Sequence, residues 1–198
     1  MYQYINPNRH KYILASASPR RKELLGLYIP GIEIVPPGVD ESFSHAKSVE
    51  DELMRIAELK ASSVAKNNPG AVVIAADTIV VKEGVVYGKP KDENDALNTL
   101  LKLRGTSHKV MTGVCAAAPS GGFTFIEKTS VTFRNYDDEL IRWYISTGEP
   151  FGRAGAYAIQ GYGALLADKI EGDYSNVVGL PVARLIYELV ERGLFRLQ

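Results

Sequence analysis

Residues 12–25 have the sequence YILASASPRRKELL, in which an apolar run passes through a short polar turn into a helical pattern. This spacing predicts a strand that leads into a helix with almost no loop between them. Ser18 is placed to cap the helix, and Pro19 suits its first position, where the missing N–H is not needed. Arg20 and Arg21 then fall in the first turn, where each cation opposes the helix dipole by ~0.3–1 kcal/mol.

Two arginines in this position indicate that an anion binds at the turn. Helical N–H groups, two serine hydroxyls and two guanidinium groups meet there, and together they suit a chain of phosphates. The hydroxyls are those of Ser16 and Ser18. The alternative is that both arginines extend into solvent beside an ordinary capped helix.

A lysine falls in the middle of the next apolar helical stripe. Residues 49–66 have helical periodicity, and Ser48 with Asp51 is typical of a capping box at the start of a helix. Lys60 projects into the apolar face of this predicted helix. Its ammonium either extends to the rim of that face or reaches an anion held in a cleft.

The apolar run at residues 71–81 contains a single acidic residue, Asp77. An ionised carboxylate in such a run is costly unless it is paired, hydrogen-bonded or bound to a metal. The alternative is a capping or bulge aspartate at the end of a strand. Asp40 and Glu41 lie in a predicted loop, where adjacent carboxylates are usually solvated unless a phosphate site is near. Lys89 is a loop lysine that carries little information by itself.

The remaining sequence alternates helical and strand patterns, with the clearest hairpin turn at residues 119–122, PSGG. Strands and helices alternate in the first half and hairpins are common in the second, which is typical of an α/β fold with a mixed sheet. We expect one domain over residues 1–198. One predicted helix begins at residue 19, three cover 49–66, 92–103 and 137–147, and a last one follows residue 181. The predicted strands cover 12–15, 32–35, 71–76, 109–118, 123–133 and 165–170, and the apolar run that ends at residue 76 resumes at 79–81 after Asp77 and Thr78.

Charge and composition argue against several classes of protein. The 23 Lys and Arg balance the 23 Asp and Glu, so the basic excess typical of a nucleic-acid-binding protein is missing. No stretch approaches the ~20 apolar residues that span a membrane, and the N-terminus lacks a secretion-signal pattern. Cys115 is the single cysteine, and the three histidines lack zinc-site spacing. We therefore expect a cytoplasmic protein that binds neither nucleic acid nor membranes.

Six short motifs occur in order between residues 12 and 190. They are LASASPRR at 14–21, VDE at 39–41, ADTIV at 76–80, GKP at 88–90, GAYAIQG at 155–161 and VGLP at 178–181. Together they resemble the Maf family, the septum-formation-inhibitor-like nucleotide pyrophosphatases. The resemblance implies a mixed twisted sheet in two lobes around a central cleft, similar to the inosine-triphosphate pyrophosphatases.

The resemblance also implies a reaction and a set of site residues. The reaction is metal-dependent cleavage of a nucleoside triphosphate to the monophosphate and pyrophosphate, a house-cleaning role linked to cell division arrest. The catalytic aspartate of the family matches Asp77, and its loop glutamate matches Glu41; the two would hold Mg²⁺ or Mn²⁺. A homodimer is implied by the family alone. The phosphate-binding positions match Ser16, Arg20, Arg21, Lys60 and Lys89.

Three further positions separate branches of the family by substrate. This chain has Arg20, Thr78 and Gln160 there, which resembles the dTTP/UTP branch, whereas the 7-methyl-GTP branch carries a bulky aromatic, a glutamine and a glutamate. A glutamate could pair with a cationic 7-methylguanine, while a neutral glutamine offers a donor and an acceptor to uracil or thymine. We therefore expect a preference for UTP and dTTP, with tolerance of modified uridine triphosphates.

Two other functions remain as alternatives. The first is a non-catalytic regulator of septation that binds a nucleotide and acts through a partner. The second is a purine-directed pyrophosphatase of the inosine-triphosphate type on the same architecture. A turnover assay separates the first from an enzyme, and a substrate profile separates the second.

Overall fold

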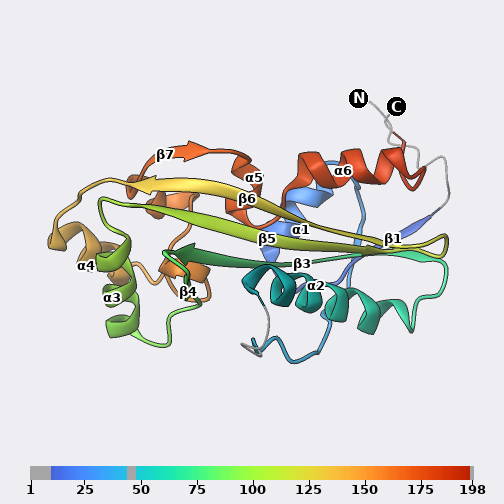
Figure 1. The fold of residues 1–198 in the computed structure, drawn as a ribbon, viewed down its shortest axis with the longest axis horizontal. Helices are drawn as coiled ribbons and strands as arrows, with labels where there is room; N and C mark the ends of the chain where they lie inside the picture. Colours follow the sequence, from blue (N-terminus) through green and yellow to red (C-terminus); the bar gives the residue numbers. More distant parts are fainter. Residues whose placement is uncertain (1–9, 44–47, 197–198) are drawn as a thin grey trace. The chain divides into compact units, whose positions relative to one another are not determined.

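A computed structural model describes residues 10–43 and 48–196 of the chain, drawn as a ribbon in Figure 1. The chain divides into two compact units, each built from segments that are distant in the sequence. The first unit contains Met1–Asp77, Thr112–Ile126 and Gly179–Gln198, and the second contains Thr78–Met111 and Glu127–Val178. The expectation of one domain over residues 1–198 stays a prediction.

The helices and strands follow one another in mixed order, as expected for an α/β protein. They are β1 (Lys11–Leu14), α1 (Pro19–Gly26), β2 (Glu33–Ile34), α2 (Val49–Ala65), β3 (Ala71–Lys82), β4 (Val85–Tyr87), α3 (Glu93–Leu103), β5 (Ser107–Ala117), β6 (Phe123–Phe133), α4 (Asp138–Ser146), the 3₁₀ turns η1 (Ala154–Ala156) and η2 (Gly161–Leu165), β7 (Ala167–Glu171), α5 (Tyr174–Val178) and α6 (Val182–Glu191). No helix in this described part of the chain is both long and apolar enough to cross a membrane.

The strands form a mixed sheet in the order β2-β1-β3-β5-β6-β7, with β4 paired to β3 off this path. β1 is parallel to both of its neighbours, with Leu14 opposite Ile34 of β2 and Ile74 of β3. The pairs β3–β4 and β6–β7 are antiparallel. Parallel pairs near the start of the chain and antiparallel pairs later confirm the mixed sheet expected from the sequence.

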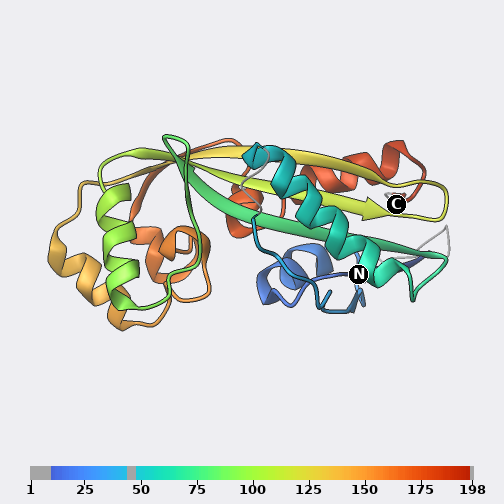
Figure 2. The same ribbon diagram turned by 60° about the horizontal axis from the view of Figure 1, so that its bottom comes forward.

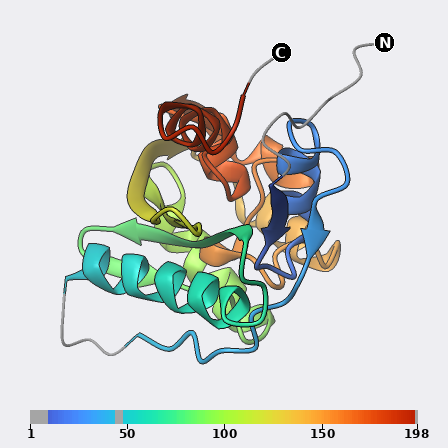
Figure 3. The ribbon, with the colours of Figure 1, turned by 90° about the vertical axis from the view of Figure 1, so that its right-hand side faces the viewer.

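In the first unit, α2 and α6 cover opposite faces of the strands (Figure 3). Successive side chains of a strand point to opposite faces, so each face of β3 takes every second residue. Val72, Ile74 and Ala76 belong to the core cluster that contains α6, whereas Val73 and Ala75 belong to the cluster that contains α2. By this alternation, Asp77 belongs to the face of β3 that α2 covers.

In the second unit, α3 and α4 pack side by side (Figure 2). Their apolar faces share one core cluster with the ends of β5 and β6 and with the segment that holds η1. Leu100, Phe133, Ile141, Tyr144 and Leu166 are among its fully buried side chains.

A buried histidine lies in this second unit. His108 is 2 % exposed, its Nε2 lies 2.9 Å from the Tyr157 hydroxyl, and its Nδ1 has no hydrogen-bond partner among the residues that the structure describes. Burial, and secondarily the charge of Lys82, lowers the pKa of His108 from 6.5 to about 4. The folded protein therefore keeps this imidazole neutral over a range where the unfolded chain binds a proton.

We expect His108 to make the protein less stable in acid. As pH falls from 6.5 to 4, the unfolded chain gains a proton that the folded state does not, so the free energy of unfolding should drop by ~3 kcal/mol from this group. Urea unfolding at several pH values gives the free energy of unfolding as a function of pH. This free energy should fall less steeply toward low pH in His108→Gln than in the wild type. An equal fall in the two proteins would contradict the prediction that His108 lowers stability in acid.

The elements that differ from the sequence expectations include β3 and α5. β3 runs unbroken through Asp77 and Thr78, so Asp77 lies inside the strand and the alternative of an aspartate at a strand end is wrong. The short helix α5 was not expected, because its five residues are too few to show helical periodicity.

Candidate active site

The turn between β1 and α1 has the local structure that its sequence predicts. Pro19 is the first helical residue, and the hydroxyl of Ser18 caps the helix by accepting from the backbone N–H of Arg21 at 3.4 Å. The buried Ser16 hydroxyl accepts from the Ser18 N–H at 3.1 Å and from Nη1 of Arg21 at 3.4 Å. Arg20 lies partly buried in the same helical turn. Ser16 and Arg21 are therefore in contact before any ligand binds.

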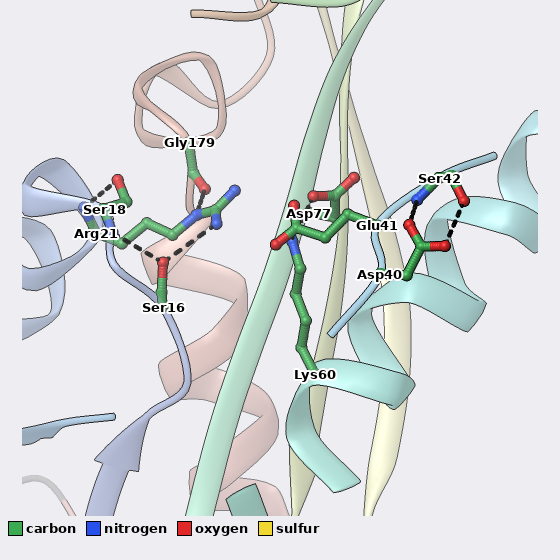
Figure 4. Close-up of polar contacts among 9 residues, drawn as sticks. All are labelled: Ser16, Ser18, Arg21, Asp40, Glu41, Ser42, Lys60, Asp77 and Gly179. Carbon is green, nitrogen blue, oxygen red and sulfur yellow. Dashed lines mark hydrogen bonds and ion pairs between the residues drawn. The ribbon is translucent and has the colours of Figure 1, made fainter. Parts of the chain in front are cut away.

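A residue far along the chain fixes the orientation of Arg21. Its Nε donates to the carbonyl oxygen of Gly179 at 2.8 Å, across 158 residues of sequence. Gly179 has a φ of 130°, a backbone conformation that favours glycine. In Figure 4 the guanidinium group of Arg21 points toward the strand that carries Asp77.

The charges around Arg21 act in opposite directions on its pKa. Burial lowers the pKa of the guanidinium, while the negative charges of Asp77 and Glu41 raise it. Arginine nevertheless keeps its charge, because a guanidinium group is not deprotonated in proteins at physiological pH. Arg21 is thus a partly desolvated cation near two carboxylates, and its interaction with an anion is stronger than it would be in water.

Lys60 joins the two carboxylates. Its Nζ lies 2.7 Å from Oδ1 of Asp77 and 2.9 Å from Oε2 of Glu41 (Figure 4). Lys60 is 4 % exposed, so its ammonium does not extend to the rim of the helix. The pairing with Lys60 explains how Asp77 keeps a charge inside an apolar strand.

The neighbouring carboxylates Asp40 and Glu41 point to different partners. Asp40 accepts from the backbone N–H and the hydroxyl of Ser42, both at 2.9 Å, whereas Glu41 reaches Lys60. The hydrogen bonds from Ser42 lower the pKa of Asp40. Of these two carboxylates, therefore, only Glu41 belongs to the charged cluster, which consists of Lys60, Asp77 and Glu41.

Helix α2 holds the loop that carries Glu41. Arg55 donates through Nη2 to the Ser42 carbonyl at 2.9 Å, and Ser63 donates to the Pro37 carbonyl at 3.0 Å. Arg55 is itself paired with the buried Glu52 at 2.9 Å. The sequence reasoning missed Arg55, whose only signal is its position three residues after Glu52 on a helix.

The donor set suits a divalent cation that arrives with phosphate. Among the described residues, no three or more His, Cys, Asp or Glu side chains are grouped as metal ligands. Glu41 and Asp77 instead offer two carboxylates that converge on one ammonium group. Mg²⁺ is usually held in this manner, by one or two carboxylates with substrate phosphates completing the shell.

The other predicted site residues belong to the second unit. Thr78 is partly buried in β3, Lys89 is exposed in the loop after β4, and Gln160 is partly buried directly before η2. The Gly155 N–H donates to the Gly88 carbonyl at 3.0 Å, which ties the loop of Lys89 to the motif that contains Gln160.

The motif that contains Gln160 approaches a strand closely at Gly155. A Cβ atom there would lie 2.7 Å from Val80 of β3, and Gly155 has a φ of +68°. Both observations require glycine at this position.

Residues 11–192 match the model of one protein family, described as Maf-like protein. The chain belongs to the Maf family. Its curated relatives include a "dTTP/UTP pyrophosphatase" of Bacillus cereus, 48% identical over 179 residues that cover 90% of this chain and 94% of the relative. A protein of the same name from Geotalea uraniireducens is 49% identical over 183 residues, which cover 91% of this chain and 94% of the relative.

Among solved structures, this Maf chain is similar in fold to a HAM1 protein from Coxiella burnetii. The TM-score is 0.51 with 14% sequence identity, and the match covers 92% of this chain and 99% of that one. An identity this low shows the fold alone. The mixed-sheet α/β class expected from the sequence is confirmed.

Proposed function

We propose that this chain hydrolyses nucleoside triphosphates, above all UTP and dTTP, to the nucleoside monophosphate and pyrophosphate. The observation that carries the proposal is the convergence of Lys60, Asp77 and Glu41, near which Arg21 contributes a second cation. The name of the two relatives, dTTP/UTP pyrophosphatase, supports this reaction for a chain that shares almost half of their residues.

The cations bind and orient the triphosphate in this proposal. Ser16 and Gly179 hold the Arg21 guanidinium in a fixed direction, so little ordering is needed when a phosphate arrives. Arg20 and Lys89 add charge, and Lys60 donates to phosphate as well as to its carboxylates. Charged N–H donors to phosphate oxygens give short, strong hydrogen bonds.

Asp77 then acts on the attacking water. As general base it takes a proton while the water oxygen forms a bond to the α-phosphorus. The bond from that phosphorus to the oxygen bridging to the β-phosphate breaks, and its electron pair leaves with pyrophosphate. The second role proposed for Asp77 is that of a metal ligand.

The proposed cofactor is Mg²⁺ or Mn²⁺, which Glu41 and Asp77 would hold. When bound, such a cation neutralises phosphate charge and lowers the pKa of a bound water. Lys60 meanwhile keeps the two carboxylates close to one another, because both are paired with its single ammonium group.

Base selection is assigned to Arg20, Thr78 and Gln160. A side-chain amide offers one acceptor and two donor hydrogens, which match the edge of uracil or thymine. A wrong base would leave buried polar groups without partners, and that cost gives strong discrimination.

We expect kcat/KM for UTP and dTTP to exceed the values for CTP, GTP, ITP and 7-methyl-GTP by at least ~10-fold. Pyrophosphate release with Mg²⁺ or Mn²⁺ present, measured for all six nucleotides, checks this. A preference for ITP or 7-methyl-GTP would contradict the branch assignment. Absence of turnover with every nucleotide would favour the non-catalytic regulator.

Three further expectations stay predictions. They are a cytoplasmic location, a homodimer and a link to cell division arrest.

A further inference from the structure

Two residues of the second unit accept hydrogen bonds from the backbone on both sides of Gln160. Glu149, just after α4, accepts from the Tyr162 N–H through Oε2 at 3.1 Å and from the Gly163 N–H through Oε1 at 2.9 Å. The Tyr144 hydroxyl donates to Oε1 of Glu149 at 3.1 Å and accepts from the Ala158 N–H at 3.1 Å. We call this arrangement of Tyr144 and Glu149 the clasp.

The clasp surrounds Gln160 without using its side chain. Ala158 lies two residues before Gln160, and Tyr162 and Gly163 lie two and three residues after it. The Gln160 side chain makes no capping hydrogen bond to the turn that it precedes. The backbone at this residue is thus fixed from both sides by groups other than its own amide.

The backbone of residues 161–163 packs closely against the clasp. A Cβ atom on Gly161, which has a φ of +67°, would lie 2.4 Å from Oε2 of Glu149. A Cβ on Gly163 would lie 2.2 Å from the Ala158 carbonyl oxygen and 2.8 Å from the Tyr144 hydroxyl. Neither glycine can gain a side chain unless the clasp opens, so the backbone and the two side chains fit closely.

The chemistry of the clasp is that of a positioning device. A carboxylate that accepts two N–H groups and one O–H group makes hydrogen bonds about twice as strong as neutral ones. Tyr144 is fully buried, so its ring is fixed by packing and its hydroxyl by the two hydrogen bonds. A group that reads a base must be held within ~0.5 Å of its productive position, which needs support of this kind.

We propose that Tyr144 and Glu149 are positioning residues for base selection. They hold the segment 158–163 so that the Gln160 amide meets the pyrimidine edge in one orientation. This inference rests on the proposed function, in which Gln160 contacts the base. UTP and CTP differ at that edge in their donors and acceptors but hardly in size, so their ratio reports the orientation of the amide.

Two variants open the clasp, and a third serves as a matched control. Tyr144→Phe removes the hydroxyl, and Glu149→Gln replaces one accepting oxygen with an NH₂ group that cannot accept from an N–H. Tyr136→Phe also removes a buried tyrosine hydroxyl from the second unit, but that hydroxyl donates to the Leu100 carbonyl at 3.2 Å.

The UTP to CTP ratio of kcat/KM is expected to fall by about tenfold in both clasp variants and to stay unchanged in Tyr136→Phe. Hydrogen exchange of the Tyr162 and Gly163 amides should be faster in the two clasp variants alone. The proposal would be overturned if Tyr144→Phe and Glu149→Gln both fold and both keep the wild-type UTP to CTP ratio of kcat/KM. An equal fall in Tyr136→Phe would also overturn it, because general loosening would then explain the result.

A binding measurement separates this inference from the proposed function. If the wild type turns over no nucleotide, the proposed function fails. The Kd ratio for the α,β-methylene analogues of UTP and CTP then tests the clasp, with the same pattern expected across the three variants. Equal Kd values for the two analogues in the wild type would overturn base selection by the clasp.

Discussion

Replacing Asp77 with asparagine is expected to lower kcat for UTP by at least ~10² while the protein stays folded. The amide keeps the shape of the carboxylate, and its oxygen can still accept from Lys60, which lies 2.7 Å from Asp77. The amide cannot take a proton from water, and it is a poor metal ligand. Steady-state pyrophosphate release at saturating UTP gives kcat, and urea unfolding shows whether the fold is kept.

Asp168→Asn is the matched control for this variant. Asp168 is also a strand aspartate paired with a cation, since it lies 3.5 Å from Arg134, but its side chain is 56% exposed. Its replacement should leave kcat unchanged. A folded Asp77→Asn protein with kcat close to that of the wild type would remove Asp77 from the catalytic role.

Lys60→Met is expected to raise KM for UTP by ~10-fold or more and to lower kcat as well. One charged donor to phosphate contributes ~1.5–3 kcal/mol, which sets the change in KM when chemistry is slower than substrate release. Methionine keeps most of the apolar stem but leaves Asp77 and Glu41 without their shared ammonium. For that reason we also expect the free energy of unfolding to fall by ~1–3 kcal/mol.

Lys169→Met provides the comparison. Lys169 is paired with Glu171 at 2.8 Å on an exposed strand, so this variant loses a lysine–carboxylate pair that lies outside the cluster. It should change neither KM nor stability appreciably, because exposed pairs contribute ~0–1 kcal/mol. Unchanged KM and kcat in Lys60→Met would show that Lys60 only balances the charge of its carboxylates.

Much of the fold could be predicted because its signals are local. The caps at Ser18 and Ser48 bind N–H groups three residues away, so the sequence alone shows where α1 and α2 begin. The turn at Glu83 and Gly84 is likewise decided by neighbouring residues, and both have the positive φ that a tight hairpin needs.

The candidate site was predictable as a set of anomalies. An arginine against a helix dipole, a lysine on an apolar stripe and an aspartate in an apolar strand each indicate a missing partner. The family motifs then assign Arg21, Lys60, Asp77 and Glu41 to one substrate, and the structure places Lys60 within hydrogen-bond distance of both carboxylates.

The sequence by itself determined the described α-helices other than α5, the mixed sheet, the family and the chemical types in the site. Only the tertiary structure decided which partners these residues meet: Gly179 for Arg21, Arg55 for the loop of Glu41, and the backbone beyond Gln160 for Glu149. The physical reason is that periodicity fixes the face on which a side chain lies, whereas a contact between distant segments depends on how whole elements pack. β3 continues through Asp77 because α2 brings Lys60 to that face of the strand. The Lys60 ammonium pairs with the Asp77 carboxylate, whose charge would otherwise be costly inside an apolar strand.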